Sequence, residues 1–259
     1  MLIRRIVTAL REQDWKTATL DFLIVVAGIL VGLQIDGIVQ DKRDARTGYE
    51  TLSRIHREMD SQRAKLERVI RNSSFHLKHV DHLATIAADP EIAAADVKFT
   101  YEALGYSAYV SDFSVQTAVF DSAVSQGVLD FIENRSVTRE IIEHYSSIDR
   151  WDRVNVVFAR YRDHFDDALA GIGGLAWARV DTEDENALAL IPPKEAIAIG
   201  RTLQSSPDFQ KWLPRAWIYY QSSGELAEER LASVLELQTM IRNELEQGPT
   251  EFRIEPSTG

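Results

Sequence analysis

The stretch Phe22–Leu33, FLIVVAGILVGL, is a run of twelve apolar residues without a charge, close to the N-terminus. The chain after it is polar, charged and helical in pattern. Twelve helical residues rise only about 18 Å, too short for a hydrocarbon slab about 30 Å thick. Residues 18–39 would rise about 33 Å. The sequence therefore predicts a transmembrane helix over 18–39 that carries a large aqueous domain.

Two other interpretations of this run stay open: a signal peptide and the core helix of a soluble protein. The short apolar length suits a signal peptide, but acidic residues precede the run and no A-x-A cleavage site follows it. The extended span admits Asp21, Gln34 and Asp36. Both carboxylates are expected near the interfaces, where a charge costs less than at the membrane centre. The flanks favour an uncleaved anchor.

The residues before the span, 1–16, predict a short amphipathic helix on the membrane surface, although it could also pack on its own protein. Its expected interfacial anchors are Arg4, Arg5, Arg11, Trp15 and Lys16. Basic residues are nearly balanced on the two sides of the span, so the positive-inside rule gives little direction. We expect a cytoplasmic N-terminus and a periplasmic main domain in a bacterial inner membrane.

Inside the span, Gly28 and Gly32 form a G-x-x-x-G pair. Small residues four apart let two helix backbones approach closely, so this pair predicts a contact with another membrane helix. Gln34 and Asp36 are included in the predicted contact. The alternative is that glycine is simply frequent in membrane helices.

Composition excludes several classes of function. The net charge of −11 argues against nucleic-acid binding and against broad electrostatic adhesion to anionic lipid. Cysteine is absent, which excludes disulfides, thiolate zinc sites and a cysteine nucleophile. Hydrophobic residues make up 45% of the chain, enough for a packed globular part.

After the span, apolar residues recur at heptad spacing, which predicts a bundle helix rather than a free coiled coil. These positions are Leu52, Ile55, Met59, Leu66 and Val69, with Gln62 interrupting them. Asn72–Ser74 is expected to interrupt this helix or to cap its next half, and Pro90 to follow its end.

The rest of the chain predicts further helices bounded by capping residues, glycine and proline. The expected segments are 113–125 after a Ser111–Asp112 cap, a helix from Asn134–Ser136 to Gly171, one from Pro192–Pro193 to Leu203, and one from Pro207 to Leu245. No window alternates with a period of two. The predicted fold is all-α: a single transmembrane helix followed by an antiparallel helical bundle over 40–247, with a disordered tail at 248–259.

Two blocks resemble an uncharacterised bacterial family of single-pass membrane proteins. The first is Gly28–Asp36, GILVGLQID, where the family typically reads G-I-L-I-A-L-Q-I-N-N-W. The second leads through Gly127-Val128-Leu129 to Asn134 and Tyr145. The resemblance covers about residues 1–150, and the chain departs from it at residues 36–38 and at Ser146. It implies a cytoplasmic N-terminus and a helical extracytoplasmic domain, and it implies no activity.

Candidate chemistry is sparse. His76, His79 and His82 are spaced three apart and are candidate metal ligands, although only adjacent pairs converge on a helix. The alternative is that these histidines form a polar face near the bundle end. Acid–base pairs such as Glu143–His144 and Asp163–His164 are more typical of a solvated face and of contacts between helices. Aromatic residues that would line a pocket or fill the core are Trp151, Trp177, Trp212, Trp217, Tyr219 and Tyr220.

The sequence thus predicts a non-enzymatic interaction or accessory subunit of a membrane complex, with no catalytic residue and no cofactor. Its expected partners are the lipid bilayer and another membrane protein, or a second copy of the chain, bound through the span. The alternatives are a ligand-sensing bundle that signals through a partner protein and a metal-dependent enzyme.

Overall fold

The computed structural model describes residues 15–107, 115–173 and 191–249, and all regular structure in these ranges is helical. Three long helices dominate: α2 (Trp15–Ala88), α5 (Arg135–Gly171) and α9 (Pro207–Gln247). The shorter elements are η1 (Pro90–Ala94), α3 (Val97–Tyr106), α4 (Ala118–Ser125), η2 (Val128–Phe131) and α8 (Pro193–Ser205). The predicted all-α class, with a long N-terminal helix followed by a helical bundle, is confirmed.

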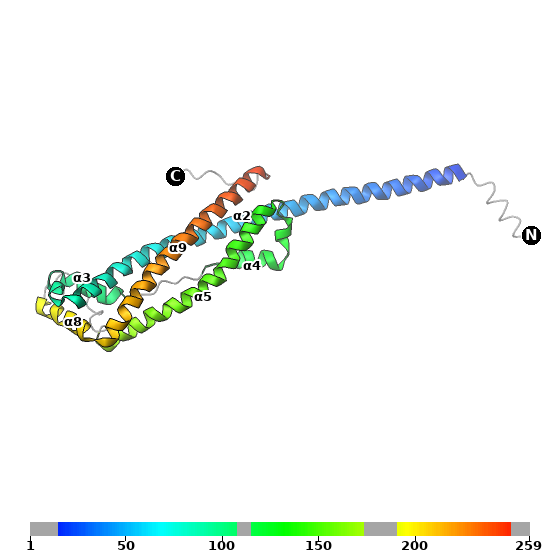
Figure 1. The fold of residues 1–259 in the computed structure, drawn as a ribbon. Helices are drawn as coiled ribbons and strands as arrows, with labels where there is room; N and C mark the ends of the chain where they lie inside the picture. Colours follow the sequence, from blue (N-terminus) through cyan, green and yellow to red (C-terminus); the bar gives the residue numbers. More distant parts are fainter. Residues whose placement is uncertain (1–14, 108–114, 174–190, 250–259) are drawn as a thin grey trace, which may run out of the picture.

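Helix α2 has 74 residues and is therefore about 110 Å long. Its N-terminal half projects alone beyond the bundle, and its C-terminal half packs against the other helices (Figure 1). The helix runs without a break through 39–40, where the predicted span meets the predicted domain. The predicted interruption at Asn72–Ser74 is wrong. Ser73 is buried beside Gly224 of α9, where two small residues let the helices pack closely.

Side-chain pairs fix the directions of the three long helices. Asp60 pairs with Gln238 and Asp81 with Trp217, so residue numbers fall along α9 as they rise along α2. Residue numbers also fall along α9 as they rise along α5. Helix α9 is therefore antiparallel to both α2 and α5, which run parallel to each other. Between two parallel helices, the chain has to run back along the bundle. Helix α3, which packs back along α2, is the first part of this return.

Two apolar clusters form the core of the bundle. The proximal cluster, nearer the projecting half of α2, includes Leu52, Ile55, Met59, Leu66, Val69, Ile132, Ile141, Tyr145, Val234, Leu237, Ile241 and Leu245. The distal cluster includes Val80, Leu83, Ile86, Phe165, Leu169, Leu203, Phe209, Leu213, Tyr219 and Tyr220. The predicted heptad face of α2 thus lies in the proximal cluster, and Gln62 is buried among it.

Local capping signals set most helix ends where the sequence predicts them. The Asn134 side chain accepts hydrogen bonds from the backbone N–H groups of Ser136 and Val137 at the start of α5. Pro207 opens α9, which continues through Pro214. Gly127 adopts a φ of +67° immediately after the Gln126 cap of α4.

Helix α4 is shorter than predicted. It begins at Ala118, after Thr117, and not at Phe113. The predicted Ser111–Asp112 cap lies outside the described residues. So do most of the 175–191 loop, most of the 1–16 interfacial helix and residues 250–259 of the predicted tail.

Candidate functional site

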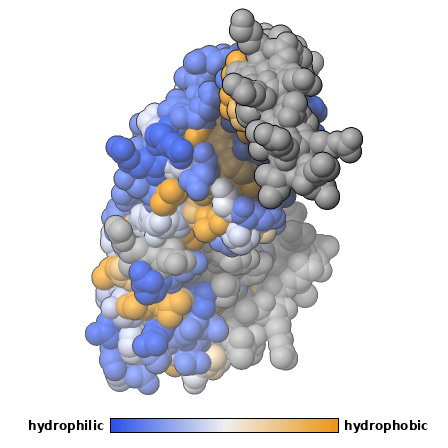
Figure 2. Space-filling model, turned by 90° about the vertical axis from the view of Figure 1, so that its right-hand side faces the viewer, coloured by the Kyte–Doolittle hydropathy of each residue, from blue (hydrophilic) through white to orange (hydrophobic). Residues whose placement is uncertain are grey.

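The predicted span is an exposed apolar segment of α2. Phe22 is 66% exposed, Leu30 is 56% exposed and Val39 is 41% exposed. A window of this helix reaches a mean hydropathy of 2.4, and none of that window is buried against the described residues. In contrast, the visible bundle surface is mostly hydrophilic, with small separate apolar patches (Figure 2). One long apolar helix near the N-terminus is therefore a candidate membrane span.

The predicted contact residues of the span do not all share one face. Gly28, Gly32 and Asp36 follow each other at intervals of four, and each step of four turns only about 40° around a helix. Gln34 lies about 200° from Gly32 and so faces the other side. A Cβ added to either glycine meets no heavy atom within 4 Å. Gly28, Gly32 and Asp36 thus form an open stripe, which we call the glycine stripe.

Arg4, Arg5 and Arg11, the expected interfacial anchors, lie outside the described residues. Trp15 and Lys16 form the first turn of α2, and their side chains are not described.

A buried polar network crosses the proximal cluster. Glu58 accepts a hydrogen bond from the Tyr145 hydroxyl at 2.6 Å and another from the Val119 backbone N–H at 2.8 Å. The Tyr145 ring stacks on Phe120 at 4.2 Å between centroids. One carboxylate of α2 therefore holds together the N-terminus of α4 and the N-terminal third of α5.

Gln62 continues this network one turn further along α2. Its Nε2 donates to the Gln116 carbonyl at 2.9 Å, which leaves its Oε1 to accept from His144 Nε2–H at 2.9 Å. His144 Nδ1 then accepts from the Ser233 hydroxyl at 3.4 Å. Gln62 thus interrupts the apolar heptad because it links α2 to α5, and through His144 to α9.

The electrostatics of the network keep His144 neutral. Burial, and secondarily the positive charge of Arg230, lower the pKa of His144 to about 4. The neutral ring carries its proton on Nε2, as its contact with Gln62 requires.

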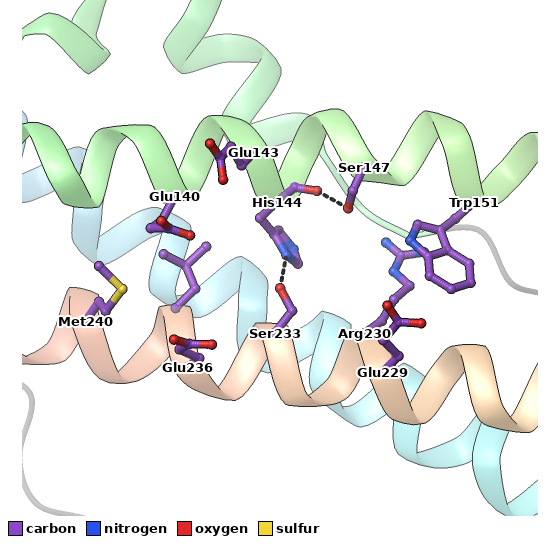
Figure 3. A pocket seen from close by; sticks show the side chains of 11 residues that line it. Glu140, Glu143, His144, Ser147, Trp151, Glu229, Arg230, Ser233, Glu236 and Met240 are labelled. Atoms are coloured by element: carbon purple, nitrogen blue, oxygen red, sulfur yellow. Dashed lines mark hydrogen bonds between the residues drawn. The ribbon is translucent and has the colours of Figure 1, made fainter.

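A cleft of about 320 Å³ lies between α5 and α9, beside His144 (Figure 3). Four exposed glutamates line it: Glu140 and Glu143 from α5, and Glu229 and Glu236 from α9. Trp151 and Arg230 also line the cleft, and the guanidinium lies 5.9 Å from the centre of the indole ring. Arg230 is only 8% exposed, and its Nε and Nη2 have no hydrogen-bond partner in the described structure.

The predicted aromatic set does not form one pocket. Trp212 stacks on His164 at 4.3 Å, and Trp217 donates its indole N–H to Asp81 at 2.8 Å. Tyr219 and Tyr220 belong to the distal cluster. Trp177 lies outside the described residues. Of the described members, Trp151 is the one that lines the cleft.

The three spaced histidines make contacts of their own in the distal half. His76 Nδ1–H donates to the Tyr106 carbonyl at 2.7 Å, and His79 Nδ1–H donates to the Phe75 carbonyl at 2.8 Å. His82 Nε2 contacts the Thr100 hydroxyl at 3.0 Å. Burial lowers the pKa of all three. Within the described ranges, no group of three or more acidic or histidine side chains is arranged to hold a metal ion. His76 and His79 are buried, and His82 is half-buried.

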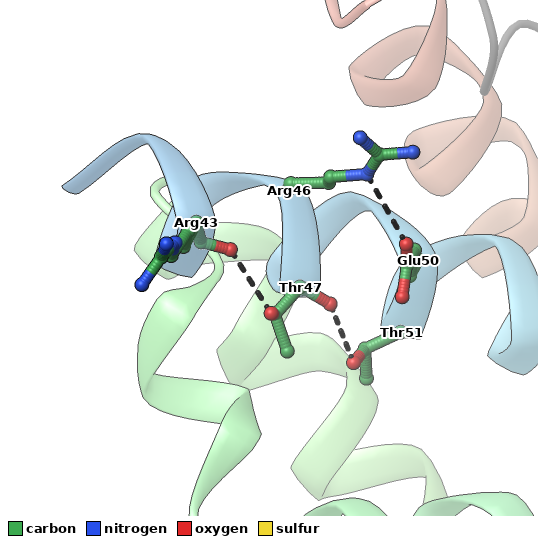
Figure 4. A network of polar contacts seen from close by, with 5 residues as sticks. All are labelled: Arg43, Arg46, Thr47, Glu50 and Thr51. Atoms are coloured by element: carbon green, nitrogen blue, oxygen red, sulfur yellow. Dashed lines mark hydrogen bonds and ion pairs between the residues drawn. The ribbon is translucent and has the colours of Figure 1, made fainter. Parts of the chain in front are cut away.

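The base of the projecting helix carries its own polar contacts (Figure 4). The Thr47 hydroxyl donates to the Arg43 carbonyl at 3.0 Å, and the Thr51 hydroxyl donates to the Thr47 carbonyl at 2.8 Å. Both threonines face α4, and their hydroxyls are satisfied by the helix itself. At Gly48, a Cβ would collide with the Phe131 carbonyl. The bundle therefore begins at Gly48, where η2 lies directly on α2.

No family model, curated protein or solved structure matches this chain.

Two parts of this geometry were not predicted from the sequence. The network around Glu58 and His144 joins residues more than 80 positions apart. Arg230 had a local signal, because it stands on the apolar face of α9 between Ala227 and Val234. A lone arginine at a core position is unusual, since arginine is almost never fully buried unless it is paired.

Proposed function

We propose that this chain is a membrane-anchored, non-enzymatic interaction or accessory subunit of a bacterial inner-membrane complex, with its N-terminus in the cytoplasm and its bundle in the periplasm. The observation that carries the proposal is the exposed apolar half of α2. Contiguous apolar surface of this extent is rare on soluble monomers and marks a membrane or protein contact. The resemblance of residues 28–36 to single-pass membrane proteins supports the same topology.

The spacing along α2 is consistent with this topology. Between Val39 and Gly48, where packing begins, eight mostly polar residues rise about 12 Å. A bilayer is about 30 Å thick in its hydrocarbon core and about 40–45 Å with its headgroups, so each headgroup layer takes about 5–8 Å. With the apolar segment in the core, these residues cross the headgroup layer and the bundle begins just outside it.

The glycine stripe is the proposed contact with a second helix. Gly28 and Gly32 leave open backbone on one side of α2, and close backbone approach is the usual basis of helix association in membranes. Asp36 lies one turn further on the same side, where a partner's donor would satisfy its carboxylate. The partner is another membrane protein or a second copy of this chain.

Replacing Gly28 and Gly32 together by leucine is expected to abolish association in mild detergent, because two large side chains then stand on the stripe. The test is co-purification, from one membrane, of two differently tagged full-length copies and of native membrane proteins. Gly37→Leu is the matched control, since Gly37 lies about 140° from Gly32 and its added Cβ also meets no heavy atom. Unchanged association of the double variant with both kinds of partner would contradict the proposed contact.

A ligand-sensing role is the second candidate, and the cleft between α5 and α9 is the observation that favours it. In this role, binding in the cleft would be signalled through a partner protein.

A further inference from the structure

The least satisfied group in the described structure is the guanidinium of Arg230. Two of its nitrogens, Nε and Nη2, are shielded from solvent and have no acceptor there. Burial lowers the pKa of Arg230, and the carboxylate of Asp152 acts in the opposite direction. A buried cation without a hydrogen-bonding partner is costly, so such groups are almost always paired in proteins. Arg230 is therefore poised to accept an anion.

The geometry of the unpaired nitrogens specifies the kind of anion. Nε–H and Nη2–H lie along the same edge of the planar guanidinium and point in the same direction. That edge matches the two oxygens of a carboxylate in a bidentate pair. Arg230 also lines a void of about 20 Å³, together with Leu66, Val69 and Trp151 among others, which has room for about one water molecule. Binding in the cleft requires this edge to turn toward it, and Nε and Nη2 make no hydrogen bond in the described structure that such a turn would break.

The rim of the same cleft has the opposite charge. Glu140, Glu143, Glu229 and Glu236 line it beside a single arginine, so the lining favours a ligand with positive charge at its outer end. The volume of about 320 Å³ lies at the lower end of the range for small-molecule sites. The Trp151 indole adds apolar surface next to Arg230. A ligand with one carboxylate and one or more amines satisfies both ends.

We propose that the cleft between α5 and α9 binds a small amino acid that carries an additional amine, with its carboxylate on Arg230 and its ammonium groups on the glutamates of the rim. The site is independent of the glycine stripe, because it lies in the bundle and uses no residue of the span.

The test uses three probes on the full-length protein in detergent: L-lysine, pentane-1,5-diamine, which lacks the carboxylate, and hexanoate, which lacks the amines. Isothermal titration calorimetry should show that L-lysine binds at least about tenfold more tightly than either of the other two, as expected for the loss of a charged hydrogen-bonded pair. Equal affinity for L-lysine and pentane-1,5-diamine would overturn the role of Arg230. Equal affinity for hexanoate would overturn the role of the rim, and no binding of any probe would overturn the site.

Variants of the protein test separately the contacts proposed for the two ends of the ligand. Arg230→Gln should weaken L-lysine at least about tenfold, while Arg242→Gln, an exposed arginine of the same helix outside the cleft, should leave affinity unchanged. Arg230→Gln removes an unpaired buried charge, so it is expected to fold and to melt at the same or a higher temperature than the parent protein. Glu236→Gln should weaken L-lysine but not hexanoate. Unaltered L-lysine affinity in Arg230→Gln would contradict the proposal, whatever happens to association through the glycine stripe.

Discussion

Replacing Phe209 by alanine is expected to lower the free energy of unfolding by about 3–5 kcal/mol, the usual cost of removing a fully buried phenylalanine. Phe209 is 0% exposed in the distal cluster. Its ring lies 5.7 Å from that of Phe165, so this pair joins α9 to α5. The Ser206 hydroxyl caps the same turn by accepting from the Phe209 backbone N–H at 3.3 Å. The side chain therefore fixes the start of α9 at the far end of the bundle.

Chemical denaturation of the full-length protein in mild detergent, followed by circular dichroism, measures this loss. Phe75→Ala is the matched control, because Phe75 is 45% exposed at the surface of α2 and its removal leaves no cavity in either cluster. The control should lose clearly less stability than Phe209→Ala. Equal losses in the two variants would show that the distal cluster is not a packed core.

Lowering the pH from 6.5 to 4 is expected to remove about 3 kcal/mol of stability through His144 alone. The folded protein holds the pKa of His144 at about 4, below its ordinary value of 6.5, because the ring is buried and Arg230 is near. In this window the unfolded chain binds the proton and the folded chain does not. The contribution is therefore fully present above pH 6.5 and is lost as the pH falls toward 4.

The variant His144→Gln isolates this effect, since an amide can still donate to Gln62 but does not titrate. Carboxylates and the other histidines with lowered pKa values, His56, His76, His79 and His82, titrate in both proteins. The stability of the variant should therefore fall less steeply between pH 6.5 and 4 than that of the parent protein. Parallel profiles in denaturation experiments would contradict the buried, neutral state of His144.

The parts of the fold that could be predicted depend on local signals. Asn134, Gly127 and Pro207 act on their own turns, so the sequence predicts the adjacent helix ends correctly. The heptad face of α2 was also predicted, because burial follows helical periodicity. The prediction at Asn72–Ser74 was wrong because these polar residues favour helix caps only by local propensity. Packing against a neighbouring helix overrides that propensity, and the helix continues through them.

The polar network and the cleft depend on tertiary contacts, which the sequence alone did not reveal. Glu58 makes its hydrogen bonds only in the folded bundle, because its partners Val119 and Tyr145 lie far from it in the sequence. The sequence shows Gln62 as a gap in a heptad and assigns His144, with Glu143, to a solvated face or to contacts between helices. It does not reveal that Gln62 and His144 are partners. In the span, the spacing of four places Gly28 and Gly32 on one face of a helix. Gln34 was grouped with them although helical geometry puts it on the other side.

The central claim is that the exposed apolar part of α2 crosses a membrane and leaves the bundle on the far side. Because the chain has no cysteine, single-cysteine variants report their own accessibility. Leu30→Cys should resist a membrane-impermeant maleimide in intact membranes and react only after the chain is unfolded in detergent. Ser205→Cys, exposed at the end of α8, should react from the periplasmic side of cells with a permeabilised outer membrane. Rapid labelling of Leu30→Cys in intact membranes, or recovery of the protein in the soluble fraction, would contradict the account.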